Sequence, residues 1–150
     1  MTRPIRLPED VRGRLAESFP DLDVDRIIIR VGLPWWTRLA PLDVRAVALR
    51  DRICVDPDVD VCSREGIALI AHELVHVAQW RRAGRHAPPG LRRAAFPVRY
   101  IGAYLRARFR GMDGISAYRS IPYEREAMRF QRSMLASGRV PPATDSWGAG

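Results

Sequence analysis

The sequence of 150 residues contains no lysine and no asparagine, and it has only two cysteines. All 25 basic residues are therefore arginine. Because lysine and asparagine both have A-rich codons, we interpret the two absences as the mark of a GC-rich genome. Two cysteines exclude a disulfide framework, so we interpret Cys54 and Cys62 as small buried hydrophobic residues. The arginine content as a whole is no argument for a binding surface.

Long apolar runs are also missing. No run reaches the roughly 18 residues that a membrane-spanning helix needs, and residues 1–8 lack the apolar core of a secretory signal. We therefore predict a cytoplasmic protein. Delivery outside the cell by a route that needs no signal peptide is the alternative. The length fits one domain around one core. We assign residues 1–140 to a single domain and residues 141–150 to a flexible tail.

Acidic residues are absent from one segment of the chain. Residues 81–110 hold nine arginines and no acid, so this segment carries +9 while the whole chain carries +8. The segment also holds four aromatic residues. An amphipathic helix that packs its aromatic residues inward would explain this composition. Contact of the segment with an anionic surface, either a membrane or a nucleic acid, is the alternative.

The motif with the clearest chemistry is His-Glu-Leu-Val-His at residues 72–76, inside the helix-patterned run 67–80. Residues four apart lie on one face of an α-helix, so His72 and His76 can bind one Zn²⁺ through one ring nitrogen each. Glu73 then lies close to the metal but remains free to act as a general base. Ser63 and Gly84 mark the predicted start and end of this helix.

A zinc ion that does chemistry usually has three protein ligands, and the motif supplies two. In the predicted helix over residues 122–137, Glu124 shares its face with the apolar stripe, whereas Glu126 points mostly the other way. A glutamate on a buried face needs a cation, so Glu124 is the predicted third ligand. Its alternative role is to favour the first turn of the helix. We expect Glu126 to support a ligand or pair with an arginine, and His86 is an alternative ligand without a supporting pattern.

The remaining periodicity predicts an α+β fold, mainly helical, with a small sheet or hairpin ahead of the motif helix, as in a minimal zincin-like core. The other predicted elements are helices over residues 8–19 and 91–110, a strand over 26–31 and a hairpin over 46–55. We expect Pro97 and Gly102 to bend or interrupt the second of these helices. A strand at the sheet edge beside the metal could hold an extended peptide by main-chain hydrogen bonds.

Three segments carry a family resemblance. They are residues 43–55, the run His-Glu-Leu-Val-His-Val-Ala-Gln at 72–79, and Tyr118 followed by Pro-Tyr-Glu-Arg-Glu-Ala at 122–127. In these the chain resembles the small metallopeptidase-like domains associated with bacterial extracellular contractile injection systems, over residues 25–135. The resemblance implies a gluzincin-like site, with the two histidines of the motif as ligands, its glutamate as base and a glutamate of the last segment as third ligand. The chain departs from the usual form at Trp80 and Ile121.

Together these observations predict a zinc-dependent peptidase that acts on a protein or peptide. Zinc lowers the pKa of a bound water toward about 7, and Glu73 takes its proton as the water attacks a peptide carbonyl. Tyr118 and Tyr123, near Glu124 in sequence, are the candidate donors to the oxyanion. One alternative is a non-enzymatic, zinc-stabilised interaction or cargo module of an injection system, which a fourth protein ligand would favour. Another is a peptidase directed to a membrane or nucleic acid by residues 81–110.

Overall fold

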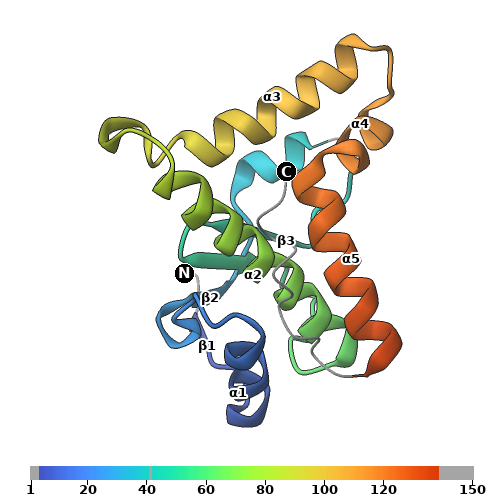
Figure 1. Cartoon of the computed structure of the whole chain (residues 1–150). Coiled ribbons are helices and arrows are strands. Elements are labelled where there is room, and N and C mark those ends of the chain that lie inside the picture. Colours follow the sequence, from blue (N-terminus) through green and yellow to red (C-terminus); the bar gives the residue numbers. More distant parts are fainter. Residues whose placement is uncertain (1–3, 41, 139–150) are drawn as a thin grey trace.

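The computed structural model describes residues 4–40 and 42–138, and the described chain has the predicted α+β fold (Figure 1). The predicted tail over residues 141–150 lies outside the described residues. The elements are β1 (Pro4–Ile5), α1 (Glu9–Ser18), β2 (Ile28–Val31), β3 (Ala46–Leu49), β4 (Arg52–Val55), α2 (Arg64–Arg85), α3 (Ala95–Phe109), α4 (Gly114–Ser120) and α5 (Pro122–Ser137). Short 3-10 helices lie at Val24–Arg26, Trp35–Leu39 and Pro89–Leu91.

The four strands form one sheet in the order β1-β2-β4-β3. β2 and β4 are parallel, and β3 and β4 form the predicted antiparallel hairpin, with Ala48 opposite Ile53. β3 is an edge strand of the sheet and contacts α2. An edge strand of the sheet therefore borders the motif helix.

Helix α2 begins where its sequence predicts. The hydroxyl of Ser63 caps the helix by accepting a hydrogen bond from the backbone N–H of Gly66 at 3.0 Å. A Cβ atom on Gly66 would lie 1.9 Å from the carbonyl oxygen of Asp60, so only glycine fits at this position. The helix ends at Arg85, one residue beyond the predicted stop at Gly84. The motif thus lies in the middle of a long, firmly anchored helix.

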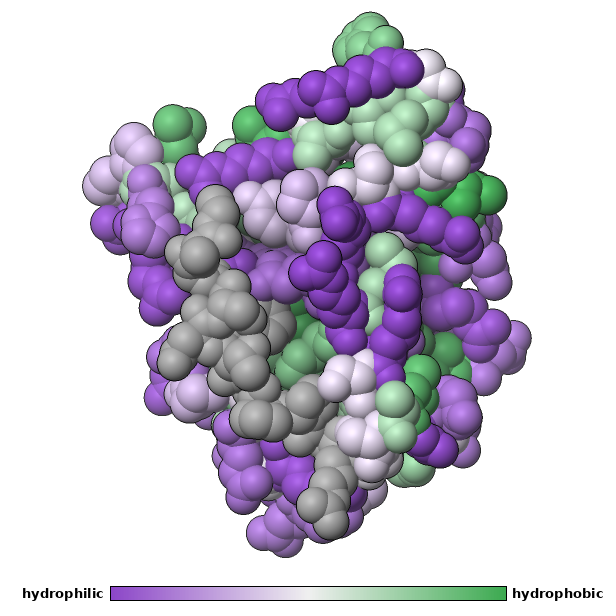
Figure 2. All heavy atoms as spheres, turned by 45° about the vertical axis from the view of Figure 1, so that its right-hand side comes forward, coloured by the Kyte–Doolittle hydropathy of each residue, from purple (hydrophilic) through white to green (hydrophobic). Residues whose placement is uncertain are grey.

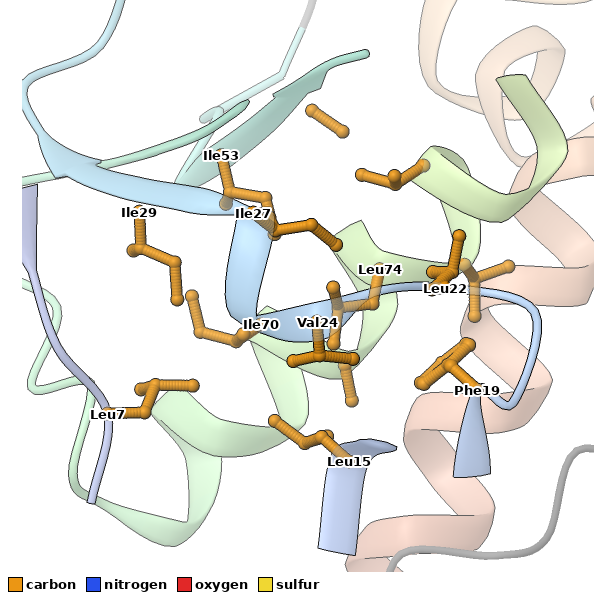
Figure 3. Close-up of a cluster of buried hydrophobic side chains, with 14 of the residues drawn as sticks. Leu7, Leu15, Phe19, Leu22, Val24, Ile27, Ile29, Ile53, Ile70 and Leu74 are labelled. Carbon is orange, nitrogen blue, oxygen red and sulfur yellow. The ribbon is translucent and has the colours of Figure 1, made fainter. Parts of the chain in front are cut away.

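The hydrophobic core lies between α1, the sheet and α2 (Figure 3). Ile70 and Leu74 of α2 face Ile53 of β4, while Leu15 of α1 closes the cluster from the other side. Full burial of a side chain of this kind contributes roughly 1.5–3 kcal/mol. Phe130 of α5 joins the same cluster, so the core fixes α5 beside the motif helix.

The region between α2 and α5 differs from the prediction in two ways. Helix α3 is continuous, and the expected interruption is absent. Pro97 lies in the first turn of α3, where a backbone N–H has no acceptor within the helix, so the ring costs no hydrogen bond. Helix α4 was not predicted because seven residues are too few for a periodic pattern. Its signal is Asp113, whose side chain caps the helix by accepting hydrogen bonds from the N–H groups of Ile115 and Ser116.

Both cysteines are free thiols. Cys54 is buried in β4 as predicted, but Cys62 is exposed, so the prediction of a buried Cys62 was wrong. Cys62 lies in the turn before α2, where its N–H donates to the carboxylate of Asp60 at 3.0 Å and its side chain faces solvent. Within the described part of the chain, every helix is too short or too polar to cross a bilayer.

Candidate metal centre

Three buried side chains meet between α2 and α5, which lie side by side in Figure 1. They are His72 and His76 of the motif and Glu124 in the first turn of α5. The two Nε2 atoms are 3.2 Å apart. Nε2 of His72 lies 3.3 Å from Oε2 of the glutamate, and Nε2 of His76 lies 3.1 Å from Oε1. We call these three residues the triad. The structure thus brings together the three predicted ligands.

The spacing of the triad fits a divalent cation. Nitrogen and oxygen donors at about 2.0–2.2 Å from a tetrahedral zinc ion are about 3.3 Å from one another, close to the three observed separations. Oε2 of Glu124 is buried, and its 3.3 Å approach to His72 is too poor in geometry to count as a hydrogen bond. A buried carboxylate oxygen without a donor is costly. The triad could therefore hold a metal ion, whose identity the distances do not fix.

Both imidazoles are held in the tautomer that a metal ligand needs. Nδ1 of His72 lies 3.1 Å from Oε1 of Gln131, and Nδ1 of His76 lies 2.8 Å from Oε1 of Gln79. An amide oxygen only accepts, so each Nδ1 carries the proton and donates. Each Nε2 then presents a lone pair to the centre of the triad. Such outer partners orient metal-binding histidines in known sites.

The orientation of the Gln79 amide is itself determined by its neighbours. Its Nε2 donates to the carbonyl oxygen of Tyr123 at 3.0 Å and to a carboxylate oxygen of Glu126. The same carboxylate accepts from Arg82 at 3.2 Å. Arg82, Glu126, Gln79 and His76 thus form a chain of hydrogen bonds that ends at the triad. Glu126 thus pairs with an arginine, as expected, and is linked to His76 through Gln79.

The charges of the triad are strongly coupled. Burial raises the pKa of the Glu124 carboxyl, but its close contacts with the two imidazoles and their charges outweigh burial and hold that pKa well below its ordinary value. Burial lowers the pKa of His76, yet the hydrogen bond and charge of Glu124 raise it to about 9. Without a metal, a proton on His76 therefore supplies the positive charge that Glu124 requires.

Glu73 lies beside the triad but does not join it. Burial raises the pKa of its carboxyl, and the charges of His76 and His72 and the backbone N–H of Ala48 in β3 act in the opposite direction. A carboxyl with a raised pKa takes up a proton more readily near neutral pH, which suits a general base. Glu73 is thus available for proton transfer between the triad and the edge strand.

The tyrosines occupy different positions around the triad. Tyr118 of α4 lies beside Glu124 and Tyr100, and burial together with the negative charge of Glu124 raises its pKa. The ring of Tyr123 instead packs against Phe96, with ring centroids 5.1 Å apart. Among the contacts of the described residues, those of Tyr123 are this packing and the hydrogen bond that its carbonyl accepts. Tyr118 therefore keeps its candidate role as a donor, and Tyr123 has no contact in its support.

Two residues of the site were missed from the sequence. Tyr100 of α3 donates a hydrogen bond to Oε1 of Glu124, and Gln131 orients His72. The signal for Gln131 was its place on the same buried stripe of α5 as Glu124. The signal for Tyr100 was its spacing of four residues from Phe96 on one face of α3, within the arginine-rich segment.

Within residues 4–40 and 42–138, no fourth histidine, cysteine, aspartate or glutamate joins the triad. His86, the alternative ligand, is exposed at the C-terminal end of α2 and does not belong to the cluster. Neither cysteine belongs to it. A metal ion held by the triad would therefore have three ligands from histidine and glutamate side chains.

Comparison with known families gives one match. The sequence profile of the eCIS core domain, a domain of extracellular contractile injection systems, matches residues 6–84, which is more than half of the chain. The matched range begins just after β1 and runs through nearly all of α2, so it includes both histidines of the triad, whereas Glu124 lies beyond it. No curated protein and no solved structure matches the chain.

Proposed function

The chain belongs to the eCIS core domain family, and from that premise we propose that it is a zinc-dependent metallopeptidase associated with an extracellular contractile injection system. One observation carries the proposal. The buried triad of His72, His76 and Glu124 could hold a metal ion, and the carboxyl of Glu73 lies beside it. The proposed substrates are proteins or peptides.

Each residue around the triad has a separate role in the proposed reaction. Zinc held by the triad would polarise the substrate carbonyl and make water a stronger acid. Glu73 takes a proton from the attacking water and passes it to the leaving amine. Its raised pKa supports this role, because a carboxyl that gains a proton more readily is a stronger base. Tyr118, half-buried and beside Glu124, is the proposed donor to the oxyanion.

The free edge of β3 is the proposed binding site for the peptide backbone. In the β3–β4 hairpin, Arg45 accepts a hydrogen bond from the N–H of Asp56 at 2.8 Å. Antiparallel pairs alternate between hydrogen-bonded and non-hydrogen-bonded, so Ala48, three residues along, directs its N–H away from β4. That N–H reaches Glu73. A peptide added along this edge would therefore lie next to the general base.

The variant Glu73→Gln tests the proposal. It removes the base but keeps the size of the side chain, so we expect cleavage of an unstructured protein such as casein to fall by about 10²–10⁴-fold while the zinc content stays unchanged. Glu65→Gln is the matched control, because Glu65 is an exposed residue of the same helix and its substitution removes the same charge. Unchanged turnover in Glu73→Gln would exclude this mechanism.

The enclosure of the triad favours a second function. The side chains of His72 and His76 are only 8% and 9% exposed, and that of Glu124 is 2% exposed. A metal ion in so closed a site could serve mainly to hold α2 and α5 together in a non-enzymatic interaction or cargo module. In that case Glu73→Gln would lack any effect on function, whereas a chelator would lower the unfolding temperature by several degrees.

A further inference from the structure

The outer face of α3 carries a row of exposed apolar side chains. Val98, Ile101, Leu105 and Phe109 are 65%, 55%, 46% and 89% exposed. Their spacing of three, four and four residues places them on one face of the helix. We call these four residues the α3 stripe. Isolated exposed apolar residues are ordinary, but a continuous row along a helix marks a surface that contacts something apolar.

The α3 stripe is not needed for the fold. The opposite face of α3 is the one that packs, through Phe96 and Ala107, and it brings Tyr100 to Glu124. A helix with apolar residues on two opposite faces is typical of a helix that is covered on both sides. In the described structure only the inner face of α3 is covered.

Arginines flank the α3 stripe. At about 100° per residue, Arg99, Arg106 and Arg110 lie about 80–120° from Val98 on one side of the stripe, and Arg108 lies about 80° from Val98 on the other side. All four are exposed. Figure 2 shows hydrophilic side chains beside hydrophobic ones along the upper part of the molecule, where Figure 1 places α3. Since residues 81–110 contain no acid, nothing within this segment neutralises these charges.

We propose that α3 lies on the surface of a membrane that contains anionic lipids, with the α3 stripe inserted among the acyl chains and the flanking arginines at the headgroups. Arginine can keep its charge in the headgroup layer while its stem covers apolar surface, and interfacial helices combine these two features. Charge complementarity selects anionic lipid as the occupant of this face. A nucleic acid would leave the α3 stripe without a role, because its backbone binds the arginines alone. This inference does not depend on the peptidase activity.

Vesicle binding by the full chain tests the proposal. The probes are vesicles of phosphatidylcholine with phosphatidylglycerol, compared with vesicles of phosphatidylcholine alone. We expect clear binding to the anionic vesicles only. Replacing Val98, Ile101 and Phe109 by serine should weaken that binding at least about tenfold by removing apolar area. Replacing Arg99, Arg106 and Arg110 by glutamine should weaken it about a hundredfold, since each arginine near an anionic surface contributes about fivefold.

The matched control removes the same number of arginine charges from a different part of the surface. Arg125, Arg129 and Arg132 are exposed on α5, and their replacement by glutamine should change vesicle binding by less than about threefold because they lie off the proposed contact face. Circular dichroism checks that every variant is folded.

Three results would overturn the proposal. The first is a wild-type chain that does not bind anionic vesicles. The second is equal vesicle binding by the wild type and the serine variant, which would mean a purely electrostatic surface of the kind that binds nucleic acid. The third is a wild-type dimer that the serine variant converts to a monomer, without vesicle binding, which would mean that a second copy covers the α3 stripe.

Discussion

The two faces of helix α2 are both buried but are stabilised in different ways. On one face Ile70 and Leu74 pack against the sheet and α1, where any apolar neighbour of suitable shape serves. On the other face His72 and His76 are buried among polar groups, and each ring nitrogen has a specific partner. The comparison shows that the apolar face needs only apolar neighbours that fill its space. The polar face needs specific donor and acceptor atoms at fixed distances and a positive charge at its centre.

Among substitutions that distinguish the two faces, we expect the largest loss of stability at Leu74. Leu74→Ala leaves a cavity on the apolar face and should lower the free energy of unfolding by about 2–5 kcal/mol. Because the cavity lies away from the triad, the loss should be the same in zinc and in chelator, as measured by urea unfolding. A loss that appeared only in zinc would mean that the two faces are not independent.

Gln79 tests how strongly the polar face depends on orientation. Gln79→Met keeps the volume but removes the acceptor for Nδ1 of His76, and it should weaken zinc binding about 10–100-fold in a competition titration. Arg82→Gln acts two residues further along the same chain of hydrogen bonds, so its effect should be clearly smaller. Equal affinity in the wild type and Gln79→Met would contradict the assigned role of this chain.

The dependence of stability on pH should distinguish the metal-free polar face from the apolar one. The pKa of His76 is raised from 6.5 to about 9, so the folded metal-free protein holds this proton more tightly than the unfolded chain. The resulting stability, on the order of a few kcal/mol, is complete below pH 6.5 and is lost as the pH rises through 9. Urea unfolding in chelator from pH 6 to 10 should show this loss, and His76→Ala should not. A stability that is independent of pH in the wild type would argue against the proton on His76.

The sequence predicted the apolar face better than the polar one, for a physical reason. Hydrophobic periodicity repeats within a helix, so α2, its cap at Ser63 and the choice of Glu124 over Glu126 as the residue that meets the histidines all followed from local spacing. The partners of a polar group come from distant segments. Gln131 is 59 residues from His72, and Tyr100 lies on another helix.

Other differences between prediction and structure also arise from context. Cys62 looked apolar by residue type, but a turn before α2 exposes it. Pro97 was expected to disturb α3, but its position in the first turn makes it harmless. Both outcomes depend on where an element begins, which periodicity fixes least well. The site residues that hydrophobic periodicity predicted correctly are those that share a helix face with a buried apolar stripe.

The most direct test of the metal centre is the zinc content of Glu124→Gln compared with that of Glu126→Gln, measured by elemental analysis after purification without chelator. The two variants remove the same charge two residues apart on α5, but only Glu124 reaches the histidine rings. We expect about one zinc ion per chain in the wild type and in Glu126→Gln, and far less in Glu124→Gln. A wild-type protein without zinc, or a Glu124→Gln variant that retains it in full, would contradict the assignment of the triad.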